Sequence, residues 1–262
     1  MDIVELKAVL EETSKAVLEA GKIISENWKK PKQIKMKGRI DIVTDTDLAV
    51  EKFLKDRLSV ILPESDFLAE ETSGSARPGK LTWIIDPVDG TTNFTHGLPM
   101  VATSVALWAD DKIVLGVVNL PILGEIFTAV RGGGTRLNGV RVSTTETGDL
   151  EKSLIATGFP YDIDNYAEAV TKRLYKVLLA TRGIRRPGAA AMDLAYLSCG
   201  RYDGFYENGL KPWDTAAGWL LVEEAGGCVT DFEGNPYNLY SPSILASNTQ
   251  LHEKLSGLIN EE

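Results

Sequence analysis

Apolar side chains recur at helical spacing in the first part of the chain. Leu6, Leu10, Val17, Ile24 and Trp28 follow a period close to that of an α-helix, which predicts one amphipathic helix over residues 2–28. The same spacing predicts a second helix over residues 48–62. Residues 40–43, 67–70 and 81–85 are short apolar runs of strand length, and Pro87 is expected to end the last of them.

The middle of the chain is rich in strand-forming residues. Three apolar runs predict strands over residues 101–108, 113–120 and 125–130. Asp110-Asp111 and the glycines at 132–134 separate or follow these runs, as turn residues do. The pattern therefore predicts antiparallel hairpins.

The second half alternates between the two periodicities. Strands are expected at residues 153–157, 204–206, 228–231 and 244–246, and helices at 166–181, 189–198, 215–225 and from 251 onward. Sheets and helices in layers follow from this mixture, in the α/β (α+β) class. We expect one unit over residues 1–262 with two closely packed halves, approximately 1–150 and 151–262.

Composition narrows the possible partners. The net charge of −9 argues against nucleic acid as the main ligand, because phosphate backbones attract basic surfaces. Two cysteines are too few for a disulfide framework, and the N-terminus lacks the basic and then apolar pattern of a signal peptide. No apolar run is long enough to span a membrane. A cytoplasmic protein that acts without a membrane is the expectation.

The strongest candidate chemistry lies in the segment from Trp83 to Asn93. An apolar run delivers Asp86, and Asp89 follows three residues later, before Gly90, Thr91 and Thr92. Paired carboxylates beside a glycine suit a hard divalent cation and a phosphate together. A helix beginning near Thr91 would turn its free N–H groups toward that phosphate. The alternative is an ordinary acidic turn after a strand.

Other acidic segments make the metal-site interpretation stronger. Glu70-Glu71 closes a short strand, and Asp47 and Asp214 each lie at a predicted helix entry. Each one alone has a plain structural explanation, such as a helix cap or a solvated edge. A convergent metal site needs several such carboxylates at the ends of strands and the starts of helices.

Several of these segments together resemble the inositol monophosphatase family. The similarity runs along nearly the whole chain and is concentrated in IVTDTD at 42–47, AEET at 69–72, WIIDPVDGTTNF at 83–94 and PWDTAAG at 212–218. The resemblance implies a five-layered αβαβα sandwich and Mg²⁺-dependent hydrolysis of a small phosphate ester. It also implies a homodimer and sensitivity to lithium.

The resemblance also implies a ligand set for the metals. Glu70, Asp86 and the carbonyl of Val88 would hold the first Mg²⁺, and Asp86, Asp89 and Asp214 the second. A third, weaker Mg²⁺ would use Glu70.

Catalytic roles follow from the same resemblance. The N–H groups of Gly90 and Thr91 would bind phosphate, and the hydroxyl of Thr91, paired with Asp47, would orient or deprotonate the attacking water. Glu70, acting through the third metal, is the other candidate for water activation.

The substrate side is expected in the second half. Gly188, Ala189 and Ala190 open a helix and allow a ligand close to the backbone, and Glu207 matches a family residue that binds a substrate hydroxyl. Arg186 is a further candidate. Together with Arg185, Arg201 and Lys211 it could meet a second phosphate.

These features leave more than one function open. The first is hydrolysis of myo-inositol monophosphate. The second is a fructose-1,6-bisphosphatase or dual-specificity sugar phosphatase. A regulatory binding protein that kept the fold is an alternative of another class, although buried carboxylates without metal would repel one another.

Overall fold

The helices of this computed structural model follow the predicted positions with small shifts. It describes residues 2–38, 41–74 and 77–260. The α-helices there are α1 (Ile3–Asn27), α2 (Asp45–Ile61), α3 (Thr91–His96), α4 (Ala167–Ala180), α5 (Ala190–Ser198), α6 (Pro212–Glu224) and α7 (His252–Asn260). The long helix predicted over residues 2–28 is confirmed.

Two helices begin earlier than their apolar pattern predicts. α2 begins at Asp45 rather than at 48, because Thr44 and Asp47 form a capping box. α6 begins at Pro212 rather than at 215, since proline suits the first turn of a helix. In both cases residues outside the apolar stripe set the start of the helix.

The larger sheet has seven strands in chain order: β3 (Asp66–Ala69), β4 (Leu81–Asp89), β5 (Ala102–Ala109), β6 (Lys112–Leu120), β7 (Glu125–Val130), β8 (Gly134–Leu137) and β9 (Val140–Arg141). β3 and β4 are parallel, and the other neighbouring pairs are antiparallel. The predicted hairpins are confirmed. Asp110 and Asp111 turn the chain between β5 and β6 with φ angles of 49° and 60°.

The prediction that Pro87 ends its strand is wrong. β4 continues to Asp89, and its register against β5 shifts between Asp86 and Asp89. A bulge leaves the ladder locally unpaired, so a residue without an N–H group is tolerated there.

The smaller sheet has five strands in the order β11 (Gly183–Arg185), β10 (Leu154–Thr157), β12 (Gly204–Asn208), β14 (Ser243–Asn248) and β13 (Gly227–Thr230). β10 is parallel to β11 and β12, and β14 is antiparallel to its neighbours. β1 (Ile34–Met36) and β2 (Ile42–Thr44) form a separate ribbon. β2 overlaps the extended piece predicted at 40–43 and ends one residue beyond it. Residue 40 lies outside the described residues. The short strands β1, β8, β9 and β11 were not predicted.

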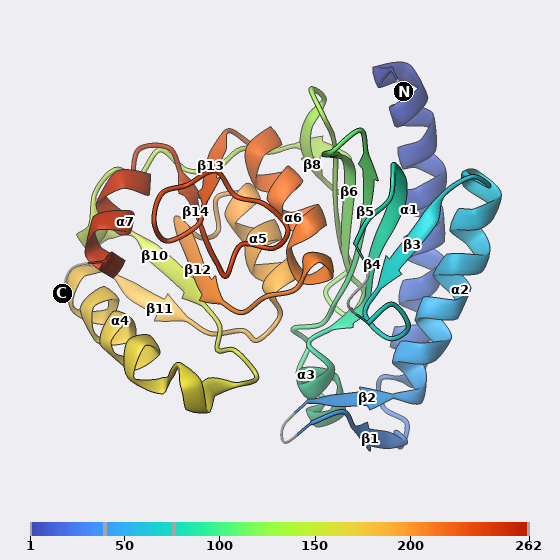
Figure 1. The fold of residues 1–262 in the computed structure, drawn as a ribbon, viewed down its shortest axis with the longest axis horizontal. Coiled ribbons are helices and arrows are strands. Elements are labelled where there is room, and N and C mark those ends of the chain that lie inside the picture. Colours follow the sequence, from blue (N-terminus) through green and yellow to red (C-terminus); the bar gives the residue numbers. More distant parts are fainter. Residues whose placement is uncertain (1, 39–40, 75–76, 261–262) are drawn as a thin grey trace.

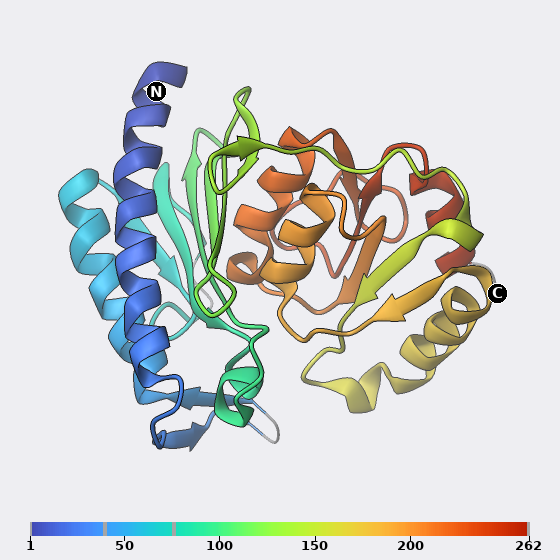
Figure 2. The same ribbon diagram turned by 180° about the vertical axis from the view of Figure 1, so that it is seen from behind.

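The elements stack in five layers, as predicted (Figures 1 and 2). From right to left in Figure 1 these are α1 with α2, the seven-stranded sheet, α5 with α6, the five-stranded sheet, and α4 with α7. Alternate side chains of one strand serve opposite faces: Ile85 packs toward α1 and α2, whereas Ile84 packs toward α6. Likewise Ala156 and Ile155 face opposite sides of the smaller sheet.

The strands of the larger sheet come from residues 66–141 and those of the smaller sheet from 154–248. The division into halves near residue 150 stays a prediction. In the described ranges, no helix has the length and apolar character needed to cross a membrane.

Candidate active site

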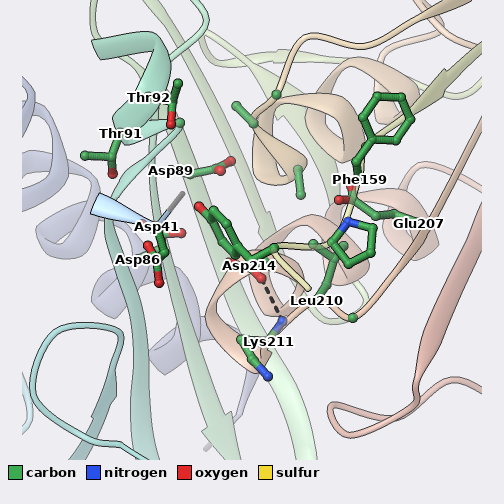
Figure 3. Close-up of a pocket in the computed structure, with 18 of the residues that line it drawn as sticks. Asp41, Asp86, Asp89, Thr91, Thr92, Phe159, Glu207, Leu210, Lys211 and Asp214 are labelled. Carbon is green, nitrogen blue, oxygen red and sulfur yellow. Dashed lines mark hydrogen bonds between the residues drawn. The ribbon is translucent and has the colours of Figure 1, made fainter. Parts of the chain in front are cut away.

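A cavity of about 490 Å³ lies where the ends of the two sheets face each other. Figure 3 shows Asp86, Asp89 and Thr91 on one side of it and Phe159 and Glu207 on the other. All the residues predicted to hold metal, and most of those predicted to contact substrate, line it: Glu70, Asp86, Val88, Asp89, Gly90, Thr91, Arg186, Gly188, Ala189, Ala190, Glu207 and Asp214. Asp47 lies behind this lining. Residues from distant parts of the chain therefore meet in one place.

The end of β4 and the start of α3 form the floor of the cavity. Asp86 is 2% exposed, and its Oδ1 accepts a hydrogen bond from the N–H of Val88 at 3.1 Å. Gly90 precedes α3 with a φ of 88°, and a Cβ there would lie 2.7 Å from the carbonyl oxygen of Met100. Only glycine fits this turn without strain. The predicted helix start at Thr91 is confirmed.

Thr91 contacts Asp47 directly. Its hydroxyl lies 2.9 Å from Asp47 Oδ1 and 2.9 Å from the carbonyl oxygen of Val88. The other oxygen of Asp47 accepts from the N–H of Thr44 at 3.0 Å and from the hydroxyl of Thr44. Burial raises the pKa of Asp47, although these hydrogen bonds oppose the shift. The predicted pairing is present, and the catalytic role stays a prediction.

Glu70 is held by a lysine. The Nζ of Lys37 lies 2.8 Å from Glu70 Oε1 and 2.8 Å from Glu71 Oε1. Burial raises the pKa of Glu71 to about 7 and also raises that of Glu70, against the effect of the ammonium. Two partly buried carboxylates thus share one cation.

Backbone N–H groups hold Asp89 and Asp214. The N–H of Ala191 donates to Asp89 Oδ2 at 2.7 Å, and that of Lys211 donates to Asp214 Oδ2 at 2.7 Å (dashed in Figure 3). Burial raises the pKa of Asp89 to about 7 and raises that of Asp214 well above its usual range.

The electrostatics of these carboxylates fit a hard cation. Burial, and then the charges of Glu70, Asp89 and Asp214, raise the pKa of Asp86. Among the described residues no ion pair neutralises Asp86, Asp89 or Asp214. In the same part of the chain, no three Asp, Glu, His or Cys side chains are placed as they would be to hold a metal ion, so the ligands would have to move together when a metal binds. The lining offers oxygen ligands and no histidine or cysteine, which suits Mg²⁺ or Ca²⁺.

The opposite wall carries groups that a substrate alcohol could contact. Glu207 is 8% exposed, and burial raises its pKa well above the usual range. The guanidinium of Arg186 lies 5.1 Å from the ring centroid of Phe159. Asn93 Nδ2 donates to the carbonyl oxygens of Met100 at 2.8 Å and Pro187 at 2.9 Å. This amide ties the floor to the opposite wall.

The inositol monophosphatase family model matches residues 5–262. The chain belongs to this family. It is 39% identical to the inositol monophosphatase of Dictyostelium discoideum, over all of this chain and 98% of the relative. It is 38% identical to the Nus factor SuhB of Escherichia coli strain K12, over 95% of this chain and 94% of the relative.

A solved structure is similar to this chain over nearly its whole length. The extragenic suppressor protein suhB from Bartonella henselae matches with a TM-score of 0.91 and 39% identity, covering 97% of this chain and 99% of that one. The inositol monophosphatase family is metal-dependent, and membership supports a phosphatase.

Several sequence-based candidates lie away from the cavity of this inositol monophosphatase family member. Arg201 forms a bidentate pair with Glu125, at 2.6 Å for each contact. Arg185 also lies outside the lining, so of the four proposed phosphate-binding cations only Arg186 and Lys211 line the cavity.

Sequence reasoning missed Asp41, Gly158, Phe159 and Tyr161, all of which line the cavity. The last three form one segment directly after β10. Their position at a strand end was the available signal, since loops that follow strands often carry binding residues.

Proposed function

We propose that this chain hydrolyses a small phosphate monoester with Mg²⁺, and that myo-inositol monophosphate is the first substrate to test. One observation carries the proposal: the hydroxyl of Thr91 is hydrogen-bonded to the buried carboxylate of Asp47, at the floor of a cavity lined by Asp86, Asp89 and Asp214. A structural cap alone does not require so many uncompensated carboxylates beside it.

The metal ligands are proposed from the lining. Glu70, Asp86 and the carbonyl of Val88 would hold one Mg²⁺, and Asp86, Asp89 and Asp214 a second, with a weaker third at Glu70. Bound Mg²⁺ supplies neutralising charge to the phosphate and lowers the pKa of water.

The side chains and backbone of the chain do the positioning. Asp47 fixes the direction of the Thr91 hydroxyl and can accept a proton from it. Its raised pKa makes it a stronger base than an ordinary aspartate. The N–H groups of Gly90 and Thr91, at the start of α3, are proposed to bind phosphate oxygens, because N–H groups of a first helical turn lack intrahelical partners.

The opposite wall is proposed to bind the alcohol. Glu207 would accept hydrogen bonds from hydroxyls, and Arg186 would donate to them. Gly188, Ala189 and Ala190 leave the backbone accessible at the start of α5.

A sugar bisphosphate is a second candidate substrate. Arg186 and Lys211 line the same cavity, and two cations could hold a second phosphate. A regulatory binding role is the candidate of another class, since relatives named Nus factor SuhB share this length and similarity. The retained carboxylate set supports an enzyme instead.

The test measures phosphate release from inositol monophosphates, fructose 1,6-bisphosphate and nucleotide phosphates while Mg²⁺ is varied. Release that requires Mg²⁺ and prefers one ester class is expected. No release from any ester at any Mg²⁺ concentration would reject the enzyme and favour the binding role. Lithium inhibition, a homodimer and a cytoplasmic location stay predictions.

A further inference from the structure

Gly158 makes an unusually close contact with Glu207. A Cβ added at Gly158 would lie 2.1 Å from Glu207 Oε2 and 2.3 Å from Oε1, a distance that no real side chain tolerates. The carboxylate of Glu207 therefore rests directly on the α-carbon of Gly158. The φ of Gly158 is not in the left-handed region, so alanine suits the backbone and only the carboxylate stands in its way.

Glu207 is buried, yet it keeps its capacity to accept hydrogen bonds. No described residue donates to its carboxylate, and burial is the largest cause of its raised pKa. A buried carboxylate without a donor is costly unless a ligand supplies one. Glu207 lines the cavity, so a ligand can reach it.

The next residue along the chain positions a cation. Phe159 stacks against the guanidinium of Arg186 at 5.1 Å, and a Cβ at Gly188 would lie 2.7 Å from Arg186 Nη1. Among the described residues Arg186 forms no ion pair with Glu207, although its charge lowers the pKa of that carboxyl. Residues 158 and 159 thus contact an acceptor and a donor that line the same cavity, where a ligand can reach both.

We propose that Gly158 is a specificity-determining positioning residue: by seating the Glu207 carboxylate in the cavity that Arg186 also lines, it selects phosphate esters of polyhydroxylated alcohols over esters whose alcohol lacks hydroxyls. The proposal rests on the proposed phosphatase function. It adds that the lack of a side chain at residue 158 determines the position of the Glu207 carboxylate, which accepts hydrogen bonds from the alcohol part of the substrate.

The test compares Gly158→Ala with the wild-type protein on two substrates, a myo-inositol monophosphate and p-nitrophenyl phosphate. The kcat/KM for the inositol ester should fall about 10- to 100-fold, mainly through KM, as expected for loss of a hydrogen bond to a charged group. The kcat/KM for p-nitrophenyl phosphate should stay within about twofold, because that alcohol makes no such contact.

Two further variants separate this effect from general damage. In a Glu207→Ala background the added methyl group meets no carboxylate, so Gly158→Ala should cause no further loss. Gly257→Ala in α7 is a matched control, since a Cβ there meets nothing within 4 Å. It should leave the kcat/KM for both substrates unchanged.

A crystal structure of Gly158→Ala supplies a readout that is independent of turnover, and it should show the Glu207 carboxylate displaced. An unmoved carboxylate, an unchanged kcat/KM for the inositol ester, equal losses on both substrates, or a double variant worse than Glu207→Ala would each overturn the proposal. A wild-type protein that hydrolyses neither ester would instead reject the phosphatase, and the crystal structure would still decide the contact.

Discussion

The cavity has two sides that differ in how their polar groups are partnered. On the carboxylate side (Glu70, Asp86, Val88, Asp89, Gly90 and Thr91), protein groups hold the side chains: Thr91 meets Asp47, Asp89 meets the Ala191 N–H, and Glu70 meets Lys37.

On the alcohol side (Gly158, Phe159, Arg186, Gly188 and Glu207), the carboxylate of Glu207 has no donor among the described residues, and Arg186 only stacks on Phe159. The first arrangement fixes geometry before a ligand arrives, as positioning a reaction requires. The second leaves hydrogen-bonding capacity for the ligand. We infer that the chemistry is built on the carboxylate side and that selectivity is built on the alcohol side.

Asp86→Asn should have the largest effect on the carboxylate side. Asp86 is proposed to bind both metals, and each contributes several kcal/mol of charge stabilisation, so activity should fall by more than about 10⁴-fold. The fold should remain, because asparagine keeps the shape. Phosphate release with saturating Mg²⁺ measures this, with Asp111→Asn in the exposed β5–β6 turn as the matched control. Near-normal turnover by Asp86→Asn would contradict the ligand assignment.

Removing the Thr91 hydroxyl should come next. Thr91→Ala keeps the backbone N–H, so KM should change little while kcat falls about 10²–10⁴-fold, the usual contribution of a positioned proton acceptor. Asp47→Asn should act on the same step. Steady-state kinetics of both variants measure the kcat and KM effects.

The double variant sharpens this prediction. If Thr91 and Asp47 act as one unit, it should be scarcely worse than either single variant. Multiplicative losses would show independent action, and Glu70 would become the better candidate for orienting water.

The metal-free protein should lose stability as the pH rises. The pKa of Asp89 is raised from 3.8 to about 7 in the folded state, so the folded protein binds this proton more tightly than the unfolded chain. The contribution of Asp89 to the stability of the folded protein is therefore greatest below pH 3.8, and it is lost as the pH rises through about 7. Thermal unfolding in a chelator measures the effect.

Asp89→Asn provides the comparison for that pH dependence. Neutralising the group should stabilise the metal-free protein above pH 7 by a few kcal/mol, roughly 5–10 °C in Tm, and should have little effect near pH 4. Adding Mg²⁺ to the wild-type protein should flatten the dependence, because binding to the folded state alone stabilises it. A Tm difference between the two proteins that does not change with pH would contradict the raised pKa.

The smallest expected effect concerns Asn93, whose side-chain amide links the two sides of the cavity. Asn93→Ala removes the donor shared by the carbonyl oxygens of Met100 and Pro187, which should cost about 1–3 kcal/mol of stability. Chemical denaturation measures it, with Asn27→Ala at the end of α1 as a control. If the tie also sets the distance between the two sides, KM should rise while the Thr91–Asp47 effect on kcat is unchanged. A loss confined to kcat would place Asn93 on the carboxylate side alone.

The local pattern of apolar and polar residues was sufficient to predict most helices and strands. The long apolar stripe of α1 and the runs of β5, β6 and β7 are periodic over many residues, so their predictions were confirmed within about a residue or two. Helix caps and β-bulges were harder to predict from the sequence. Thr44 moved the start of α2, and β4 passed through Pro87, because one hydrogen bond or one register shift outweighs a short apolar run.

The sequence by itself singled out the carboxylates, the glycine turn and Thr91 that line the cavity, because residue types suited to metal and phosphate chemistry stand there at short spacing. Only the tertiary structure decided which cations reach the cavity, since Arg201 and Arg186 look alike in sequence but one pairs with Glu125 and the other lines the cavity. It also decided the contact of Gly158 with Glu207, 49 positions apart in the chain. This contact depends on how β10 and β12 are paired, since Gly158 directly follows β10 and Glu207 lies in β12, and no local periodicity encodes that pairing.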